Sequence, residues 1–341
     1  NEFGGLDFPF RNGGGGSAGL FANFSGPSIR NLALVEVDIM GGSRVGALAG
    51  SMLGVSAINV SITGRIEGNR YVGGLAGQVT SNGGVVSSLA GVAVEADVFG
   101  VMNGALTNES FAVGGIIGSL DTGATLFGSR FSGNVEGDNT VGGLVGINGT
   151  SNIQESWSNG AVSGQTKVGG LVGANGSETI NCGPPSCVPG SGQGRGALIV
   201  DSYSTGAVSG ENGVGGIAGE NREGSSIERV FSVSPVTGDG DAGALVGLNG
   251  GDVLNSFWSR QASGRTVACD SITSCAPTTR NLTLSQFSIR SIFVDAGWDF
   301  ENVWGIDAEI NDGLPFLRAT QLVEVAHRHH HHILLLFLLN N

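Results

Sequence analysis

Short runs of alternating apolar and small polar residues fill most of this chain, and glycine interrupts each run. Alternation with a period of two is typical of β-strands. No stretch of about 12 residues inside the repeats combines helical periodicity with capping residues. Repeated glycine would also cost a helix roughly 1 kcal/mol per residue relative to alanine. The pattern therefore predicts short strands joined by tight turns.

One hexapeptide, Val-Gly-Gly-Leu-Val-Gly at 141–146, recurs along the chain with small changes. Its copies begin at Val45, Val72, Val113, Val141, Val168, Val214 and Ala242. Successive copies start 27, 41, 28, 27, 46 and 28 residues apart. A period near 27 or 28 residues, lengthened twice by insertions, indicates stacked units that bury their apolar faces on one another. A β-propeller is the main alternative, but its blades usually need about 40 residues or more.

We therefore predict an all-β fold, a right-handed parallel β-helix (β-solenoid) of about nine coils with roughly 27–28 residues per coil. The predicted organisation is an opening segment at 1–16, the solenoid at 17–264, a closing segment at 265–318 and a tail at 319–341. Insertions are expected near 84–112 and 180–198, where the spacing of the repeat lengthens.

Several side-chain columns repeat at fixed offsets from the hexapeptide. A glycine column at Gly41, Gly68, Gly137, Gly164, Gly210 and Gly238 predicts a turn with positive φ, because glycine adopts such a conformation most easily. Aromatic residues lie upstream of the hexapeptide, and we expect them to stack in one file inside the coils: Phe131, Trp157, Tyr203, Phe231 and Phe257. A third column holds Asn148, Asn175, Asn221 and Asn249.

The asparagine column predicts a ladder in which each side chain hydrogen-bonds its neighbours in the coils above and below. The alternative is that asparagine only tolerates a left-handed turn at this position. Neither interpretation makes these residues catalytic.

The pattern Ile-x-x-Ser-(aromatic)-Ser-x-Gly-x-Val-x-Gly-x-x-x-Val-Gly-Gly-Leu-Val-Gly-x-Asn, nearly complete at 153–175 and 199–221, resembles the GLUG repeat of large bacterial surface proteins. The resemblance covers roughly residues 17–318. It implies an exported adhesin or a filamentous-haemagglutinin-like array. The family has no general catalytic residue to transfer to this sequence.

The charge balance disfavours some partners. The formal net charge is −13, and Lys167 is the single lysine, so no basic stripe is available for nucleic acid. Asp239 and Asp241 flank a glycine, which more often makes a solvated turn than a calcium site. We predict no metal site and no cofactor.

Four cysteines occur in two close pairs, Cys182 with Cys187 and Cys269 with Cys275. Two local disulfides in an oxidising compartment are the first interpretation. A four-cysteine zinc site would need distant loops to meet, and neither pair has Cys-x-x-Cys spacing. Free thiols remain a third possibility.

The tail combines a histidine run at 329–332 with an apolar heptad at 333–339, which is too short to span a membrane. A vector-encoded tag, a metal-binding run and a strand that docks on a neighbouring subunit are the open interpretations.

We expect a non-catalytic extracellular adhesion or structural module, such as a cell-surface adhesin stalk or fibre segment. Its partners would be cell-surface glycans, proteins or copies of itself, with no nucleic acid and no membrane span. A self-assembling filament subunit is the alternative, because solenoid ends expose strand edges. A carbohydrate-active β-helix enzyme and an ice-binding solenoid are further alternatives.

Overall fold

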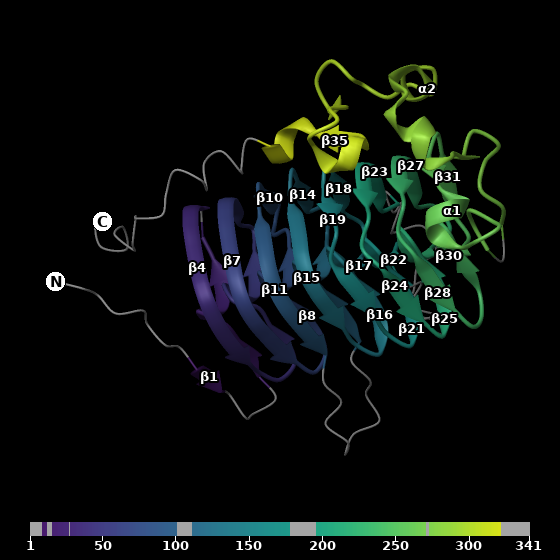
Figure 1. Cartoon of the computed structure of the whole chain (residues 1–341). Helices are drawn as coiled ribbons and strands as arrows, with labels where there is room; N and C mark the ends of the chain where they lie inside the picture. The colour runs from purple at the N-terminus through teal and green to yellow at the C-terminus, as the bar shows by residue number, and fades with distance from the viewer. Residues whose placement is uncertain are drawn as a thin grey trace.

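The structure of this protein is a computed structural model that describes residues 9–11, 16–26, 28–100, 111–177, 196–270 and 273–321. Strands make up 54% of the structure and helices 8%. The strands form long parallel sheets that run along the molecule (Figure 1). The predicted β-rich, solenoid-like architecture is therefore confirmed in its class, while the coil number and the right-handed sense stay predictions.

Two sheets contain eight strands each within the described residues. The first, called the β2–β29 sheet, consists of β2 (Ser17–Ala18), β5 (Arg44–Val45), β8 (Tyr71–Gly73), β12 (Ala112–Gly114), β16 (Asn139–Gly142), β21 (Thr166–Gly169), β25 (Asn212–Gly215) and β29 (Ala242–Gly243). The second, called the β3–β30 sheet, consists of β3 (Phe21–Ser25), β6 (Ala49–Leu53), β9 (Ala76–Thr80), β13 (Ile117–Asp121), β17 (Val145–Asn148), β22 (Val172–Asn175), β26 (Ala218–Asn221) and β30 (Val246–Asn249).

The third sheet has 17 strands and carries the longest ones. Its strands are β1 (Pro9–Arg11), β4 (Ser28–Met40), β7 (Ser56–Gly68), β10 (Ser88–Ala90), β11 (Ala93–Gly100), β14 (Thr125–Phe127), β15 (Arg130–Glu136), β18 (Asn152–Gln154), β19 (Trp157–Ser158), β20 (Ala161–Ser163), β23 (Leu198–Ser204), β24 (Val208–Gly210), β27 (Ser226–Ser232), β28 (Val236–Gly238), β31 (Asp252–Leu254), β32 (Phe257–Trp258) and β33 (Arg280–Asn281).

The strand register reproduces the sequence repeat. Val113 pairs with Val72 on one side and with Val141 on the other, so consecutive hexapeptides occupy the same place in consecutive coils. The fourth residue of every copy is fully buried: Leu48, Leu75, Ile116, Leu144, Leu171, Ile217 and Leu245. A period of 27 or 28 residues thus stacks like residues into the core.

Part of the segment expected as an insertion near 84–112 belongs to the regular sheet. In β11, Val94 pairs with Ile62 and Phe131, and Val98 pairs with Ile66 and Val135. The sequence hides this coil because its hexapeptide follows only after residues 101–110, which lie outside the described residues, as do 178–195 of the second insertion.

The glycine column does not form the predicted turn with positive φ, because none of its six members has a φ in that region. A Cβ on Gly68 would lie 2.5 Å from Val45 Cγ2, and one on Gly210 would lie 2.8 Å from Val168 Cγ2. Glycine is therefore required here by close packing against the valine that opens the hexapeptide.

A different column adopts the left-handed conformation. It consists of Asn59, Gly91, Gly128, Glu155, Asp201, Arg229 and Asn255, with φ between 46° at Glu155 and 64° at Gly91. Each member follows directly after one strand of the 17-stranded sheet or lies within a strand, so the sheet bends at the same point in every coil. Most members are not glycine, which is why the sequence did not reveal this column.

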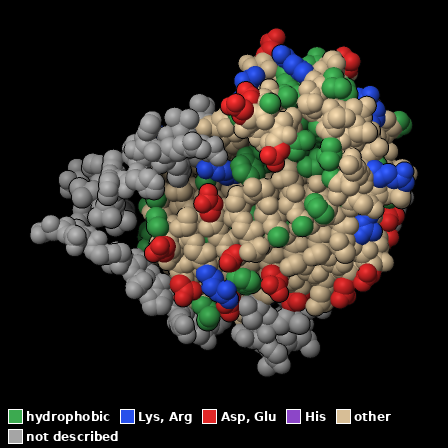
Figure 2. All heavy atoms as spheres, viewed as in Figure 1, with side chains coloured by type: hydrophobic (Ala, Val, Ile, Leu, Met, Phe, Trp, Pro, Cys, Tyr) green, Lys and Arg blue, Asp and Glu red, His purple; other side chains and the backbone are tan. Residues whose placement is uncertain are grey.

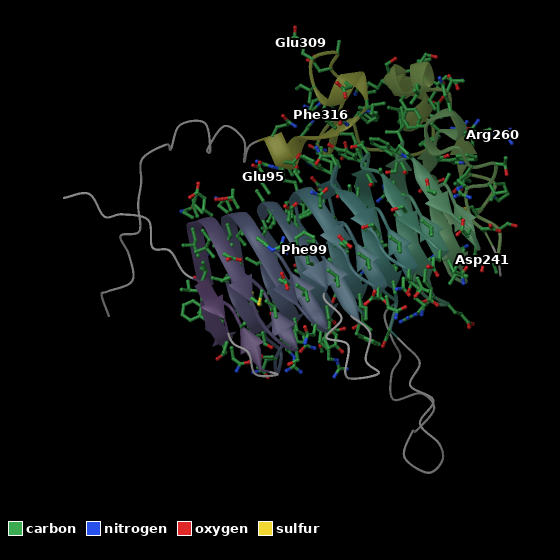
Figure 3. All side chains as sticks on the ribbon, turned by 60° about the horizontal axis from the view of Figure 1, so that its bottom comes forward. Glu95, Phe99, Asp241, Arg260, Glu309 and Phe316 are labelled. Carbon is green, nitrogen blue, oxygen red and sulfur yellow. A yellow bond between two sulfur atoms is a disulfide. The ribbon has the colours of Figure 1, made fainter. Side chains whose placement is uncertain are left out.

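The closing segment covers one side of the solenoid. It contains 3-10 helix η1 (Leu284–Ser288), α2 (Arg290–Val294), 3-10 helix η2 (Asn311–Gly313) and an antiparallel pair of β34 (Trp304–Gly305) and β35 (Phe316–Leu317). Figure 1 shows it above β14, β18, β23 and β27, and Figure 3 shows its labelled Glu309 and Phe316 on the side away from Asp241.

The last coil is followed by α1 (Arg260–Ser263) and a loop that covers its end. The backbone N–H groups of Leu245 and Val246 donate to the carbonyl oxygen of Ala268 at 2.8 and 3.1 Å. A disulfide joins Cys269 to Cys275 within this loop. Among the described helices, none has the length and apolar character required to cross a membrane.

Candidate functional site

The aromatic residues expected in one interior file occupy two different faces of the 17-stranded sheet. Phe131 pairs with Ser158, whereas Trp157 pairs with Arg130, so Phe131 and Trp157 are out of register by one residue. Because side chains alternate between the faces of a strand, such an offset places them on opposite sides. The prediction of a single interior file that includes Phe131 and Trp157 is therefore wrong.

The inward side chain changes from large to small between these coils. Phe131 points inward and faces Gly115. In three coils a serine points inward and faces the second glycine of the hexapeptide, where a Cβ on Gly143 would lie 3.0 Å from Ser158 Cβ. Ser204 and Ser232 face Gly170 and Gly216 in the same way. In these coils the residue before the serine carries the aromatic ring, which therefore lies on the outer face.

The outer aromatic column stacks between coils. The rings of Trp157 and Tyr203 are nearly parallel, with centroids 5.8 Å apart and an interplanar angle of 10°. Tyr203 and Phe231 stack at 4.8 Å and 5°. Phe257 continues the column in register with Phe231. Offset or stacked aromatic pairs contribute about 0.5–1.5 kcal/mol each beyond their buried area.

The closing segment packs its own aromatic residues onto this column. Phe293 meets the ring of Phe257 edge-on at 4.9 Å, and Trp304 lies 6.0 Å from Phe231. The second hydrophobic core of the molecule consists of both sides of this contact: Tyr203, Phe231, Val233, Phe257, Leu282, Phe287, Phe293, Trp298, Phe300, Trp304 and Leu317. The aromatic column therefore lies on the outer face of the solenoid, where the closing segment buries it.

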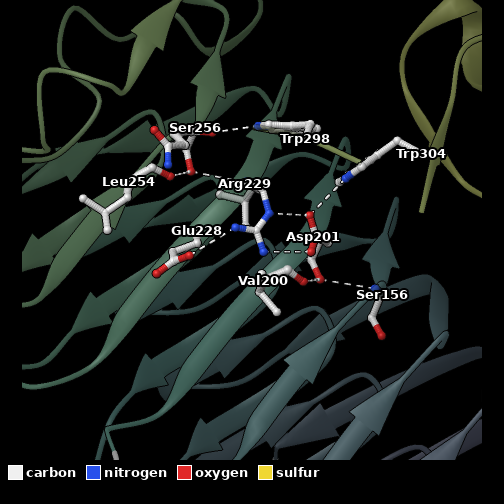
Figure 4. A network of polar contacts seen from close by, with 12 residues as sticks. Ser156, Val200, Asp201, Glu228, Arg229, Leu254, Ser256, Trp298 and Trp304 are labelled. Carbon is white, nitrogen blue, oxygen red and sulfur yellow. Dashed lines mark hydrogen bonds and ion pairs between the residues drawn. The ribbon is translucent and has the colours of Figure 1, made fainter. Parts of the chain in front are cut away.

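A polar network surrounds the contact (Figure 4). Arg229 binds both carboxylate oxygens of Asp201, at 2.9 and 3.1 Å. The indole Nε1–H of Trp304 donates to Asp201 Oδ1 at 3.1 Å, and that of Trp298 donates to the carbonyl oxygen of Asn255 at 2.8 Å. These bonds connect the left-handed column to the closing segment and fix the orientation of both indoles.

Glu155 lies at the margin of this network. Burial raises the pKa of its carboxyl group above the ordinary value, and the negative charges of Asp201 and Asp299 raise it further. Hydrogen bonds from the side chain and backbone of Asn302 lower the pKa of Asp299. As pH falls, Glu155 therefore takes up a proton before Asp299 does.

The asparagine column hydrogen-bonds from coil to coil. Asn148 donates from Nδ2 to Asn175 Oδ1 at 2.9 Å, Asn175 to Asn221 at 2.9 Å, and Asn221 to Asn249 at 3.0 Å. All four residues are fully buried. Asn249 continues the ladder by donating to Thr273 Oγ1 at 3.1 Å. The ladder therefore satisfies buried amides inside the coil and leaves no catalytic group exposed along it.

A second polar ladder uses the serine that precedes the aromatic position of the repeat pattern. The backbone N–H of Ser129 donates to Ser156 Oγ at 3.1 Å, and that of Ser156 donates to Ser202 Oγ at 3.2 Å. These serines each precede a residue of the outer column, a recurrence visible in the sequence at Ser129, Ser156, Ser202 and Ser256. They hold the bend at the left-handed column together.

Other candidate residues do not converge on this site. Cys182, Cys187 and the histidine run at 329–332 lie outside the described residues. No group of three or more His, Cys, Asp or Glu side chains within the described ranges is arranged to hold a metal ion. On the face shown in Figure 2, acidic and basic side chains are scattered among uncharged surface.

Comparisons with known proteins give a consistent name. No protein-family model matches the chain. Over 148 residues it is 31% identical to an immunoglobulin A1 protease of Streptococcus pneumoniae, a match that covers 41% of this chain and 7% of that protein. Over 136 residues it is 31% identical to an immunoglobulin A1 protease of Streptococcus sanguinis, covering 38% of this chain and 7% of the relative. The match thus involves only a small part of each curated relative.

A crystal structure from Bacteroides ovatus, named provisionally as an immunoglobulin A1 protease, is also similar. The TM-score is 0.47 with 18% sequence identity, over 86% of this chain and 75% of that chain.

The sequence-based prediction that this protein is not an enzyme is contradicted by these relatives, which are named as proteases. The prediction rested on the absence of a catalytic motif from the repeats. A solenoid repeat specifies stacking and carries no information about the activity of the protein that contains it.

Proposed function

We propose that this chain is a β-solenoid region of an extracellular protease of the immunoglobulin A1 type, and that it contributes a surface that binds the immunoglobulin. The observation that carries the proposal is the 148-residue match, at 31% identity, to the streptococcal proteases of that name. The match covers only 7% of the relative. Protease activity on immunoglobulin A1 is therefore part of our proposal.

The structure offers a rigid scaffold for such a surface. Three parallel sheets hold the coils in register, and the closing segment fixes one side through aromatic contacts and the Asp201–Trp304 hydrogen bond. Rigid scaffolds that present connecting segments are common recognition elements. An extracellular location agrees with the disulfide between Cys269 and Cys275, because disulfides persist in oxidising compartments.

The sequence predicts an adhesion role, and a narrower version of that role is compatible with this proposal. We keep the GLUG-type array as an interpretation of the repeat and propose that adhesion is directed at a glycoprotein, immunoglobulin A1, rather than at a cell surface in general. About nine right-handed coils remain part of this proposal.

Binding and cleavage assays with purified immunoglobulin A1 test the proposal. The immobilised chain is expected to retain immunoglobulin A1 and not immunoglobulin G, as measured by biolayer interferometry. A parallel incubation followed by gel electrophoresis records whether the immunoglobulin heavy chain is cut. Absence of both binding and cleavage would overturn the proposal, because neither a recognition surface nor an activity for that substrate would then exist in this chain.

A further inference from the structure

The two ends of the solenoid differ in how their strand edges are covered. At the end that follows β30, residues 267–270 and 273–282 hydrogen-bond to the last strands. Val246 forms a parallel bridge with Cys269, and β33 pairs in parallel with β32. The disulfide between Cys269 and Cys275 closes this loop. The strands of the last coil are therefore covered by a segment that follows them in the chain.

The opposite end leaves strand edges open among the described residues. It is formed by the first coil, which consists of β2, β3 and β4. β2 and β3 each pair on one side only, with β5 and with β6. β1 covers only the part of β4 at Asp38–Met40. Figure 1 shows β4 at this end and β30 and β31 at the other. An open edge presents unpaired backbone N–H and C=O groups, which are a template for pairing with another strand.

The apolar side chains of the first coil are less buried than their counterparts one coil further on. Phe24 is half-buried, whereas Met52, its partner in register, is 1% exposed. Leu34 is also half-buried, whereas Ile62, its partner in β7, is 1% exposed. Phe21 is half-buried as well, and its ring lies 5.2 Å from that of Phe24. Within the described residues, the first coil therefore lacks the neighbour that buries the same positions in the second.

The edge strand β3 also lacks the residues that commonly protect an open edge. Natural proteins guard such edges with charged side chains, above all lysine, or with proline. The sequence of β3, Phe-Ala-Asn-Phe-Ser, contains neither a charged residue nor a proline. A further strand can therefore pair with β3 without burying a charge of β3.

We infer that the first coil is an interface between two copies of this chain, in which β3 pairs with β3 of the second copy. Because the last coil is covered, a head-to-tail stack has no second open edge, and assembly stops at two copies. A two-fold axis through the middle of β3 makes the pair antiparallel and places Asn23, its central residue, opposite its own counterpart. The interface goes beyond the proposed function and does not depend on immunoglobulin binding.

The mass of the full chain in solution tests this inference. Sedimentation equilibrium should give twice the monomer mass of 34.4 kDa at high concentration and should approach the monomer mass on dilution. Asn23→Lys should raise the dissociation constant by about tenfold or more, because like charges that face each other across an interface oppose association. Ser51→Lys, at the paired position one coil further in, is the matched control and should have a much smaller effect. Circular dichroism checks that both variants keep the fold.

A cysteine at the same position tests the geometry of the pair. Asn23→Cys should form an intermolecular disulfide under mild oxidation, since opposite residues of an antiparallel pair have Cβ atoms about 4.5–5.5 Å apart. Ser51→Cys should not, because its two copies would lie about 14 Å apart, at three strand spacings. Non-reducing electrophoresis measures both results.

Three results would overturn the inference. The first is a monomer at every concentration of the unmodified chain, and the second is a series of species larger than the dimer. The third is equal behaviour of the substitutions at Asn23 and Ser51, either in the dissociation constant or in cross-linking, because β3 would then not be the strand that pairs.

Discussion

The coils before and after residue 140 place their large side chains on opposite faces of the 17-stranded sheet. In the earlier coils the large side chain points inward, as for Ile62, Val94 and Phe131, and its neighbour on the outer face is small or polar. In the later coils serine points inward at Ser158 and Ser204, and aromatic rings occupy the outer face. The coils that carry aromatic rings on the outer face are therefore the ones that need the closing segment to bury those rings.

The interior column that contains the asparagine ladder also differs between the earlier and the later coils. Met52, Val79 and Leu120 are fully buried apolar residues in the earlier coils, whereas asparagine replaces them from Asn148 onward. The junction is visible at Asn148, whose Oδ1 has no partner among the described atoms because Leu120 precedes it in the column. The later coils thus combine polar ladders inside with an apolar contact outside.

Removing an outer ring should have the largest effect. Phe231→Ala deletes a fully buried ring that contacts Tyr203 and Trp304, and should destabilise the chain by about 3–5 kcal/mol. Urea unfolding monitored by circular dichroism measures the change. Phe127→Ala, at a ring that is 38% exposed, serves as control and should cost much less. Equal losses in the two variants would contradict the assignment of Phe231 to a core.

The middle of the asparagine ladder should be more sensitive than its end. Asn175→Leu leaves Asn148 and Asn221 each without one hydrogen bond, and should cost about 2–4 kcal/mol because buried amides lose their partners. Asn148→Leu breaks one such bond next to Leu120 and should cost about 1–2 kcal/mol. Both values follow from urea unfolding. A larger loss for Asn148→Leu than for Asn175→Leu would be incompatible with a ladder that ends at Asn148.

An asparagine that extends the ladder by one coil should be less destabilising than an asparagine placed alone among apolar residues. Leu120→Asn places a donor opposite the unpartnered Oδ1 of Asn148, whereas Val79→Asn places an amide between apolar neighbours. We expect Leu120→Asn to be the more stable variant by about 1 kcal/mol, since one hydrogen bond is regained. Thermal melting of the pair measures the difference, and the reverse order would show that the apolar coil environment dominates.

Glu155 should have the smallest effect, and it depends on pH. Its raised pKa means that the folded state favours the protonated form, so this group contributes more stability as pH falls through its folded pKa. Glu155→Gln should therefore stabilise the chain at pH 7 by a few tenths of a kcal/mol. The gain should vanish once the pH falls below the ordinary pKa of a glutamate side chain, because the carboxyl group is then protonated in both states. Urea unfolding at pH 7 and at pH 4 measures both values.

Glu95→Gln, at an exposed position in the earlier coils, is the matched control and should change the free energy of unfolding at pH 7 by less than Glu155→Gln does. A stabilisation by Glu155→Gln that persisted at pH 4 would contradict the electrostatic explanation.

The sequence predicted the coil period, the alignment of hexapeptides and the asparagine positions, because each depends on residues that recur at a fixed offset. It did not predict which face the aromatic residues occupy. Phe131 precedes its hexapeptide at Val141 by ten residues, whereas Trp157 precedes its own at Val168 by eleven, and the strand register keeps this difference of one residue. A difference of one residue reverses the face of a strand, so the aromatic residues did not form one column. The left-handed residues Glu155 and Asp201, which form the bend, have no distinctive composition.

The sequence also did not predict that the closing segment packs on the aromatic column. Nothing local in the sequence specifies that the indoles of Trp298 and Trp304 meet Asn255 and Asp201, about 40 to 100 positions away. Such long-range contacts follow from the stacking of coils and not from a short pattern.

A double-mutant cycle between Phe231 and Trp304 tests the central claim most directly. The claim is that the aromatic column faces outward and is buried by the closing segment, with these two rings 6.0 Å apart. The free energies of unfolding of Phe231→Ala, Trp304→Ala and the double variant should show a coupling of about 1 kcal/mol, because each ring loses the other as a neighbour. Additive losses, with no coupling, would place Phe231 inside the coil and contradict the account.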